Sequence, residues 1–383
     1  MKIAIVRQRY NPYGGAERFV ERVLAALANN RVGAGVRVSI ITRKWRGGEQ
    51  QAIECKPFYL GSLWRDWGFA RCVCRLLQRE KFDLVQSHER LSCCDIYRAG
   101  DGVHREWLAQ RAQTQNPLQS VLTRLNPYHR YVLAAERAMF ASKQLKAVIC
   151  NSHMVKQEIQ RYFALPDDRL HVIYSGIDST EYHPGLRRQY RQDIRLQLGV
   201  VEETPVFLYV GSGFARKGLA VAMQALASVP QAHLWVVGKD KHSRRYQKLA
   251  GQLGISERMR FLGGQQDVKP YYAAADALVL PTLYDPFPNV ALEAMACGLP
   301  VITSEKSGAA ELLRHGESGF VFPASDTAGV AMAMQRLCSP QTAQAMGAAA
   351  RNAVLPYSPA AMAAAMRDLY ANLLKQSSSA NSL

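Results

Sequence analysis

A pattern of short apolar strands alternating with amphipathic helices constrains the fold of this chain more than any other feature. The first copy has KIAIV at 2–6, a turn with two glycines, a helical pattern over 16–30 and the strand pattern VRVSIIT at 36–42. The pattern starts again with TPVFLYVGS at 204–212, GLAVAMQALASV at 218–229 and AHLWVVG at 232–238. Apolar strands joined by helices are typical of parallel sheets that are covered on both faces. The sequence therefore predicts an α/β protein with two doubly wound, Rossmann-like domains.

The two copies of the pattern set the predicted domain limits. We place the first domain at residues 1–175 and the second at 176–357, joined through the polar segment 178–186. A final helix over about 358–377, capped by Ser358, is expected to pack back on the first domain, and the tail 377–383 is expected to be disordered. Two facing domains of this kind form a deep cleft, with ligands at the carboxyl ends of both sheets.

Composition narrows the possible environments and partners. The chain has 383 residues, a net charge of +17 and no run of eighteen apolar residues, so it is predicted to be globular without a membrane-spanning helix. The first 175 residues carry +13 and the remainder +4, which favours an anionic partner: acidic lipid head groups, a phosphorylated acceptor or nucleic acid. No nucleic-acid-binding module is recognisable, so nucleic acid is not expected. The eight cysteines lack metal-site spacing and are expected to be buried free thiols of a cytoplasmic protein.

The stretch YDPFPNVALEAMACGLPVITS at 284–304 is the candidate centre of a ligand site. Seven residues separate Asp285 from Glu293, and Pro286 and Pro288 keep the first acid outside the helix that carries the second. A loop that ends at a helix N-terminus offers N–H donors and a positive dipole end, which suits a ligand with hydroxyls and anionic oxygens, such as a nucleotide sugar. The alternative is a buried turn whose acids are solvated or cap the helix.

The segment GSGFARKG at 211–218 follows the first strand of the second domain. Small residues at the strand end precede two cations, Arg216 and Lys217, and then a helix. Adjacent cations suit a diphosphate without an obligatory metal, because they neutralise charge that develops on a leaving phosphate. The alternative is a solvated pair on a loop. Gly14 and Gly15, in the first strand–helix turn, would let the backbone approach an anion, and an ordinary tight turn is the alternative there.

Together these motifs resemble the retaining, nucleotide-sugar-dependent glycosyltransferases of family 4, which have the two-domain GT-B fold. GSGFARKG is similar to the family's diphosphate loop, DPFPNVALEAMACGLPVI to its motif of two acids, and YNPYGGAER to its N-terminal glycine loop. The order and spacing cover nearly the whole chain. More narrowly, GSGFARKG, VVGKDKHSRRYQKLAGQLGI and NPYHRYVLAAERAMF are similar to bacterial lipopolysaccharide core glucosyltransferases that act on heptose.

The resemblance assigns roles to individual residues. It implies that Arg216 and Lys217 bind the donor pyrophosphate. It also implies that Glu293 accepts hydrogen bonds from the donor ribose and that Asp285 lies near hydroxyls of the transferred sugar. The other implied donor-binding positions are Gly14, Gly15, Gly213, the main chain of Leu262 and Gly263 (which would meet a base such as uracil), and the N–H groups of Phe287, Asn289 and Val290. This chain departs from the family pattern at two positions, with Asp285 in place of Glu and Pro288 in place of Gly. Because of both departures, the resemblance does not determine which sugar is transferred.

The implied chemistry is retaining transfer without a metal or another cofactor. The acceptor hydroxyl attacks from the face that the diphosphate leaves, and a phosphate oxygen takes its proton, so the cations matter more than a general base. Candidates for catalysis or acceptor binding in the first domain are Asp101, between two glycines, His88, after a buried-type strand, and His104. Each of the three has an alternative role as a turn or capping residue.

The implied donor is a nucleotide-diphosphate sugar, with a UDP-sugar favoured, and the implied acceptor is an anionic glycolipid. A hexose or N-acetylhexosamine would be added to the lipopolysaccharide core; a polyprenol-linked capsule or O-antigen glycan is the alternative, and nucleic-acid binding a remote one. Residues 64–81 place Arg71, Arg75 and Arg79 on one helix face after Trp64 and Trp67. This favours peripheral contact with the anionic inner face of the cytoplasmic membrane, although a solvated surface helix has the same pattern. Residues 105–137 are expected to be an acceptor-side insertion.

Overall fold

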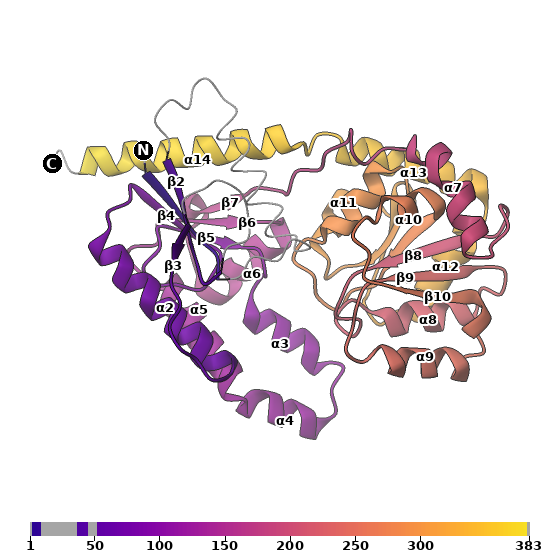
Figure 1. Ribbon diagram of the computed structural model, residues 1–383, viewed down its shortest axis with the longest axis horizontal. Coiled ribbons are helices and arrows are strands. Elements are labelled where there is room, and N and C mark those ends of the chain that lie inside the picture. The colour runs from indigo at the N-terminus through magenta and orange to yellow at the C-terminus, as the bar shows by residue number, and fades with distance from the viewer. Residues whose placement is uncertain (1, 9–36, 45–51, 381–383) are drawn as a thin grey trace. The chain divides into compact units, whose positions relative to one another are not determined.

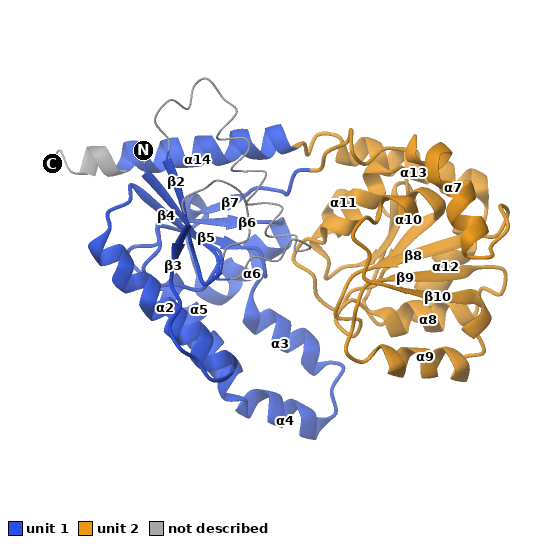
Figure 2. Ribbon diagram, viewed as in Figure 1, with its two compact units in different colours: residues 1–176, 359–383 blue, residues 177–358 orange. Residues whose placement is uncertain are grey.

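The computed structural model describes residues 2–8, 37–44 and 52–380. The helix expected over 16–30 and the candidate residues Gly14 and Gly15 lie outside these ranges. The chain forms two compact units, residues 1–176 with 359–383 and residues 177–358 (Figures 1 and 2). Each unit has its own parallel sheet and its own hydrophobic core.

The first unit is built on a sheet whose seven described strands pair in parallel, in the order β3–β2–β1–β4–β5–β6–β7. The strands are β1 (Lys2–Val6), β2 (Arg37–Thr42), β3 (Ala52–Glu54), β4 (Leu84–Ser87), β5 (Ile96–Ala99), β6 (Ala147–Cys150) and β7 (Leu170–Val172). The chain winds outward from β1 in both directions, so the sheet reverses its order between β1 and β4. Ligands of such doubly wound sheets bind at the carboxyl ends of the strands near that reversal.

The described helices of the first unit are α2 (Gly61–Arg79), α3 (His104–Ala112), α4 (Pro117–Leu125), α5 (Pro127–Phe140), α6 (His153–Phe163) and α14 (Pro359–Ala380). α6 begins at a serine cap, because the Ser152 hydroxyl accepts a hydrogen bond from the Val155 N–H at 3.2 Å. α3, α4 and α5 occupy the segment expected to be an acceptor-side insertion, which is therefore helical.

The C-terminal helix α14 belongs to the first unit and lies along its sheet (Figure 1). Met366 and Tyr370 share a buried cluster with Ile5 and other strand residues, and Tyr370 Oη donates to Gln86 Oε1 of β4 at 2.7 Å. The helix continues to Ala380, so the expectation of a disordered tail is wrong for residues 377–380. No glycine or proline interrupts the chain there, and extending an existing helix is far easier than starting one.

The second unit repeats the architecture with six parallel strands in the order β10–β9–β8–β11–β12–β13. Its strands are β8 (Val206–Val210), β9 (His233–Val237), β10 (Met259–Gly263), β11 (Ala277–Leu280), β12 (Val301–Ser304) and β13 (Gly319–Phe322). Its helices are α7 (Leu186–Gln197), α8 (Leu219–Ala227), α9 (Ser243–Gln252), α10 (Lys269–Ala274), α11 (Asn289–Ala296), α12 (Thr327–Leu337) and α13 (Pro340–Val354). β8 takes the place that β1 holds in the first unit. The predicted α/β class with two Rossmann-like units is confirmed.

α7, which begins where the expected linker ends, is not among the elements expected from the sequence. Its buried residues include two arginines, and Arg195 is only 2% exposed. The Arg195 guanidinium donates to Asp276 Oδ2 at 2.7 Å and, from Nη1, to three carbonyl oxygens between residues 201 and 204 at 2.9 Å each. Leu186, Tyr190 and Ile194 recur at helical spacing, so the sequence did carry an amphipathic signal, but polar residues, including the two buried arginines, fill most of the positions between them.

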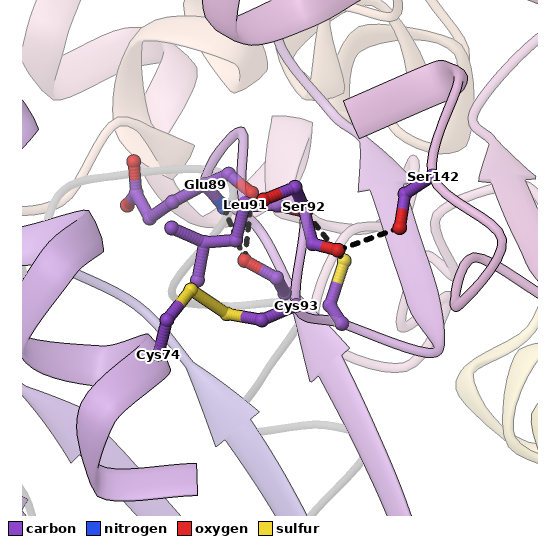
Figure 3. The surroundings of a disulfide bond; sticks show 8 residues. Cys74, Glu89, Leu91, Ser92, Cys93 and Ser142 are labelled. Carbon is purple, nitrogen blue, oxygen red and sulfur yellow. Dashed lines mark hydrogen bonds between the residues drawn. A yellow bond between two sulfur atoms is a disulfide. The ribbon is translucent and has the colours of Figure 1, made fainter. Parts of the chain in front are cut away.

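Four of the eight cysteines form disulfide bonds, so the expectation of free thiols is wrong for these four. Cys55, directly after β3, pairs with Cys72 of α2. Cys74 of the same helix pairs with Cys93 in the turn between β4 and β5 (Figure 3). Residues two positions apart on a helix point to different sides, so the two bonds join α2 to two separate segments. The other cysteines are free thiols: Cys94, Cys150, Cys297 and Cys338.

The second disulfide helps to hold the turn that follows β4. Ser142, after α5, donates from Oγ to the Ser92 carbonyl oxygen at 2.7 Å, next to Cys93 (Figure 3). At the other end of the turn, the Glu89 N–H donates to Ser87 Oγ at 2.9 Å. The backbone of residues 87–93 is therefore fixed from both ends, and with it the position of the candidate residue His88.

We expect reduction of the two disulfides to destabilise the first unit. The bonds link residues 17 and 19 positions apart, and loops of this length restrict the unfolded chain by about 3 kcal/mol each. Treating the purified oxidised protein with a thiol reductant should therefore lower its Tm by on the order of 10 °C in calorimetry. The Cys74→Ser variant keeps only one of the two bonds, so reduction should lower its Tm by about half as much. The control variant Cys338→Ser loses only a free thiol, so reduction should lower its Tm by the full amount. An unchanged Tm after reduction verified by mass spectrometry would contradict this account.

Candidate functional site

Two loops at the carboxyl ends of neighbouring strands in the second unit form the candidate site. Residues 211–218 follow β8, and residues 281–288 follow β11. The Leu283 N–H and the Thr282 hydroxyl both donate to the Arg216 carbonyl oxygen, at 2.7 and 3.0 Å. Gly218 has a φ of +75°, and a Cβ there would overlap the Pro281 carbonyl oxygen. Only glycine therefore permits the two loops to approach so closely.

A compact group of three charges lies between these loops. Lys217 Nζ is 2.7 Å from Asp285 Oδ2, and Arg216 Nη1 is 3.4 Å from the same oxygen. Arg216 Nη1 also donates to the Tyr284 carbonyl oxygen at 2.8 Å. Lys217 and Asp285 are 9% and 7% exposed, whereas the Arg216 side chain is 35% exposed. Two cations against one carboxylate leave a positive charge at this point, which suits an anion.

The two cations determine the protonation state of Asp285. Burial raises the pKa of its carboxyl, but the Lys217 ammonium and the Arg216 guanidinium outweigh burial and hold the pKa below its usual range. The stabilisation that the ionised pair gives is present above the pKa of an unfolded Asp, about 3.9, and is lost as the pH falls through the lower folded value. Asp285 is therefore a carboxylate, and paired with cations, throughout the neutral pH range.

Glu293 lies inside α11, as the pattern of residues 284–304 predicts. The helix starts at Asn289, and the N-cap residue Pro288 has no side chain that accepts a hydrogen bond from the first turn. Glu293 is 3% exposed, and its Oε2 accepts a hydrogen bond from the Tyr272 hydroxyl of α10 at 2.9 Å. The sequence does not single out Tyr272, because one tyrosine in the run KPYYAA carries no signal of its partner.

The remaining donor-binding candidates of the second unit lie on the same edge of the sheet. Gly213, with a φ of +74°, lies in the loop after β8, and Leu262 and Gly263 end β10. The carbonyl oxygen of Gly263 accepts from the Gly238 N–H at 2.7 Å, and that of Leu262 accepts from Gln265 Nε2 at 2.6 Å. Phe287, Asn289 and Val290 surround the start of α11. The structure thus brings the two cations and Asp285 together, while the base-binding and sugar-binding roles stay predictions.

Two candidates of the first unit follow the carboxyl ends of β4 and β5. His88 comes directly after β4 and is 5% exposed. Burial, together with the nearby Arg98 and Arg7, holds the pKa of its imidazole well below the usual value. Asp101 is exposed in the turn after β5. His88 is therefore neutral at neutral pH, whereas the Asp101 carboxyl is open to solvent.

Glu136 of α5, which the sequence does not single out, holds the turn that carries Asp101 and His104. Its Oε1 accepts from the His104 backbone N–H at 3.0 Å and from Arg90 Nε at 3.1 Å. The sequence could have pointed to Glu136, because it lies in the helical run LAAERAMF, and an acid among apolar neighbours indicates a buried helix position. His104 Nε2 lies 3.1 Å from His129 Nδ1. Burial, Arg90 and His129 lower the pKa of His104 to about 3, so its ring is neutral at neutral pH.

Exposed apolar side chains gather on two helices of the first unit. Near the start of α2 they are Phe58, Leu60, Leu63, Trp64 and Trp67, and on α4 they are Leu118, Val121, Leu122 and Leu125. The Arg71 guanidinium carbon lies 5.5 Å from the centre of the Trp67 ring, and the three arginines predicted to share a face of α2 are all exposed. Tyr128 of α5 donates to Asp66 of α2 at 3.1 Å, so α5, which follows α4 directly in sequence, lies beside α2. The face of α4 was missed, although its apolar residues recur at helical spacing.

Residues 2–8, 37–44 and 52–380 contain neither a candidate membrane-spanning helix nor a candidate metal site. No helix there is both long enough and apolar enough to cross a membrane. No three His, Cys, Asp or Glu side chains come together there as ligands of a metal ion would.

Comparison with known protein families and sequences relates both units to glycosyltransferases. Residues 13–181 match the family model described as Glycosyltransferase Family 4, and residues 190–353 match the model described as Glycosyl transferases group 1. Lipopolysaccharide glucosyltransferase WaaG of Escherichia coli K12 is 30% identical over 334 residues, which cover 84% of this chain and 85% of that protein.

Solved structures show the same relationship in three dimensions. The crystal structure of WaaG, a glycosyltransferase involved in lipopolysaccharide biosynthesis, matches with a TM-score of 0.82 at 26% identity and covers 96% of this chain and 99% of that one. Anabaena HepE in complex with UDP-glucose matches in fold, with a TM-score of 0.71 at 20% identity over 98% of this chain and 100% of that one. Sequence similarity along most of both chains, on the same pair of sheets, shows that this chain belongs to family 4 of the glycosyltransferases and has the GT-B fold.

Proposed function

We propose that this glycosyltransferase moves a hexose or N-acetylhexosamine from a nucleotide-diphosphate sugar, with a UDP-sugar favoured, to the core oligosaccharide of lipopolysaccharide. Transfer would retain the anomeric configuration and would need no metal. The observation that carries the proposal is the buried pair of Lys217 and Asp285, with Arg216 beside it, at the carboxyl end of β8. The relatives support it, since the E. coli protein is named a lipopolysaccharide glucosyltransferase and HepE was crystallised with UDP-glucose.

The diphosphate of the donor is assigned to the net positive charge of this cluster. Asp285 offsets one of the two cations and holds both in place, so an incoming diphosphate meets cations that need no reorganisation. Lys217 is buried, and charge interactions are stronger there than in water. The first turn of α11 adds N–H donors at a positive helix end. Glu293, oriented by Tyr272, would accept hydrogen bonds from the ribose hydroxyls.

The transfer step then requires little acid–base catalysis from the protein. The bond between the anomeric carbon and the phosphate oxygen breaks, and its electron pair stays on the leaving diphosphate, where Arg216 and Lys217 neutralise it. The acceptor oxygen bonds to the anomeric carbon from the same face, and its proton passes to an oxygen of the leaving phosphate. In the first unit the exposed Asp101 would orient the acceptor hydroxyl, while the neutral rings of His88 and His104 are limited to neutral hydrogen bonds.

The acceptor is proposed to be an anionic glycolipid, reached at the inner face of the cytoplasmic membrane. The first 175 residues carry a net charge of +13, which attracts anionic head groups. Leu60, Trp64, Trp67, Arg71 and Arg75 form what we name the α2 docking surface, and all five are exposed. Tryptophan rings favour the boundary between head groups and acyl chains, and arginines favour anionic lipids.

A transfer assay tests the proposed reaction. The protein is incubated with radiolabelled UDP-glucose, UDP-galactose or UDP-N-acetylglucosamine together with core-truncated lipopolysaccharide or a polyprenol-linked glycan. Label is expected in the lipopolysaccharide. Label only in the polyprenol-linked glycan would favour the alternative acceptor, and transfer from none of the donors to either acceptor would contradict the proposal.

Arg216→Gln is expected to lower kcat on the order of 10²-fold, because one of the two cations that stabilise the leaving phosphate is lost. The side chain is 35% exposed, so the fold should keep its Tm. Lys217→Ala is less clean, because it removes the nearer cation of the buried Asp285 and should cost about 3 kcal/mol of stability. The matched control is Lys241→Gln, an exposed cation after β9. A kcat for Arg216→Gln within twofold of the wild type would contradict the role.

Asp285→Asn separates two roles for this carboxylate. If Asp285 offsets the cations, removing its charge should tighten the binding of UDP on the order of tenfold in calorimetry, because one opposing charge is gone from a buried cluster. UDP carries no transferred sugar, so contacts with sugar hydroxyls do not enter this measurement. Weaker UDP binding would show instead that Asp285 is needed to place the cations or contacts the nucleotide itself.

The double variant Trp64→Ser, Trp67→Ser is expected to reduce binding to vesicles with anionic lipid at least tenfold in co-sedimentation, because it removes the apolar part of the α2 docking surface. Leu196→Ser is the control, since Leu196 is 80% exposed but lies in the second unit. Turnover on a water-soluble acceptor fragment should stay unchanged. Equal binding by the double variant and the wild type would contradict the surface without affecting the proposed reaction.

A further inference from the structure

A cavity of about 490 Å³ opens on the first unit among α3, α5 and α6, and the proposed transfer reaction makes no use of it. Its lining combines aromatic rings, one buried carboxylate and two arginines: Phe140, Tyr162, Phe163, Glu136, Arg105 and Arg137. A cavity of this size takes a sugar or a similar small molecule. The mixture of ring faces, an acceptor oxygen and cations indicates which chemical class fits.

The aromatic part of the lining is fixed in orientation. The rings of Phe140 and Phe163 lie with their centres 4.3 Å apart, and Phe163 is half-buried. The hydroxyl of Tyr162 donates to Glu106 Oε2 at 2.6 Å, and Glu106 Oε1 accepts from Gln110 Nε2 at 2.6 Å. Rigid aromatic side chains offer apolar area with little loss of side-chain freedom, and the C–H face of a pyranose is apolar in the same way.

The carboxylate of Glu136 has unused hydrogen-bonding capacity. Glu136 is 1% exposed, and its Oε1 accepts from Arg90 and from the His104 backbone. Its Oε2 is buried and accepts no hydrogen bond from any residue in the part of the chain that the structure describes. Leaving such an oxygen unpaired is costly, and a side-chain rotation that brings Oε2 to the cavity surface, where a hydroxyl can donate to it, would remove that cost.

Two arginines supply positive charge at the same cavity. Arg105 and Arg137 are both exposed, and neither forms an ion pair with the residues described. The Arg105 guanidinium carbon lies 4.8 Å from the centre of the Tyr162 ring, which keeps the group against the cavity wall. A planar guanidinium binds phosphate and carboxylate through paired hydrogen bonds.

We propose that this cavity binds a pyranose that carries a phosphate or carboxylate group. The ring packs on the aromatic wall, Glu136 turns its Oε2 to the cavity and accepts a hydrogen bond from a hydroxyl, and the anionic group meets Arg105 and Arg137. Glu136 also holds the backbone of His104, so the bound sugar is connected through one side chain to the turn that carries Asp101. The inference goes beyond the proposed transfer and does not require it, although a charged sugar of an anionic acceptor would fit.

Calorimetry with glucose 6-phosphate and with glucuronate tests the inference on the full-length protein. Saturating UDP is present throughout, to keep the probes away from Arg216 and Lys217. We expect saturable binding of at least one probe, with free glucose and inorganic phosphate binding at least tenfold more weakly. The double variant Arg105→Gln, Arg137→Gln should lose at least tenfold in affinity, and Ala141→Trp, which places a large ring at the cavity, should abolish binding.

The matched control is Arg161→Gln. Arg161 is exposed and stands 5.6 Å from the centre of the same Tyr162 ring but does not line the cavity, so this variant should bind as the wild type does. Binding that survives in both cavity variants, inorganic phosphate that binds as tightly as glucose 6-phosphate, or the absence of saturable binding by either probe would overturn the inference. None of these results depends on turnover. A negative binding result therefore does not contradict the proposed reaction, and a negative transfer assay does not contradict the proposed sugar site in the cavity.

Discussion

The ion pair of Lys217 and Asp285 joins the loops that follow β8 and β11, and the rest of the candidate site depends on it. Removing two charges from water costs several kcal/mol for each ion, and only good geometry with further hydrogen bonds offsets that cost. Here the backbone of Asp285 is fixed, which gives the pair its good geometry, and Arg216 supplies a further contact to the same carboxylate oxygen. The Asp285 N–H donates to the Lys306 carbonyl oxygen, and the Gly308 N–H donates to the Asp285 carbonyl oxygen, both at 2.9 Å. One residue therefore fixes the ends of three adjacent strands.

This arrangement also explains how a site for a polyanion stays folded without its ligand. Two neighbouring cations without a counter-charge would repel one another, and Lys217 would be a buried charge without a partner. A single carboxylate relieves the repulsion, yet it leaves one positive charge uncompensated. The short side chain of Asp285 suits this purpose, because it reaches the cations while its own backbone is held by the turn after β12. Stability and ligand affinity oppose each other at this residue, as is common at functional sites.

Much of the fold could be predicted because its elements follow local rules. The strands are apolar runs, the loops that carry Arg216 and Asp285 come directly after two of them, and prolines fix where α11 begins. Several failures have a different cause, since they depend on partners that are distant in sequence. The disulfides require α2 to lie between Cys55 and Cys93. α7 buries Arg195 against Asp276, and Glu293 is oriented by a tyrosine of another helix. No spacing along the chain reveals such pairs, although the motif order alone indicated the family.

The chain enters the second unit at residue 177 and leaves it at 358, so that unit is continuous in sequence while the first is not. During synthesis, all residues of the second unit emerge before α14 does. The second unit can therefore fold while the ribosome still holds the chain, whereas the sheet of the first unit lacks the helix that buries Ile5 and its neighbours until α14 has been translated. The N-terminal half of this protein thus finishes folding last. A stop codon placed just before α14 would damage the unit that was translated first.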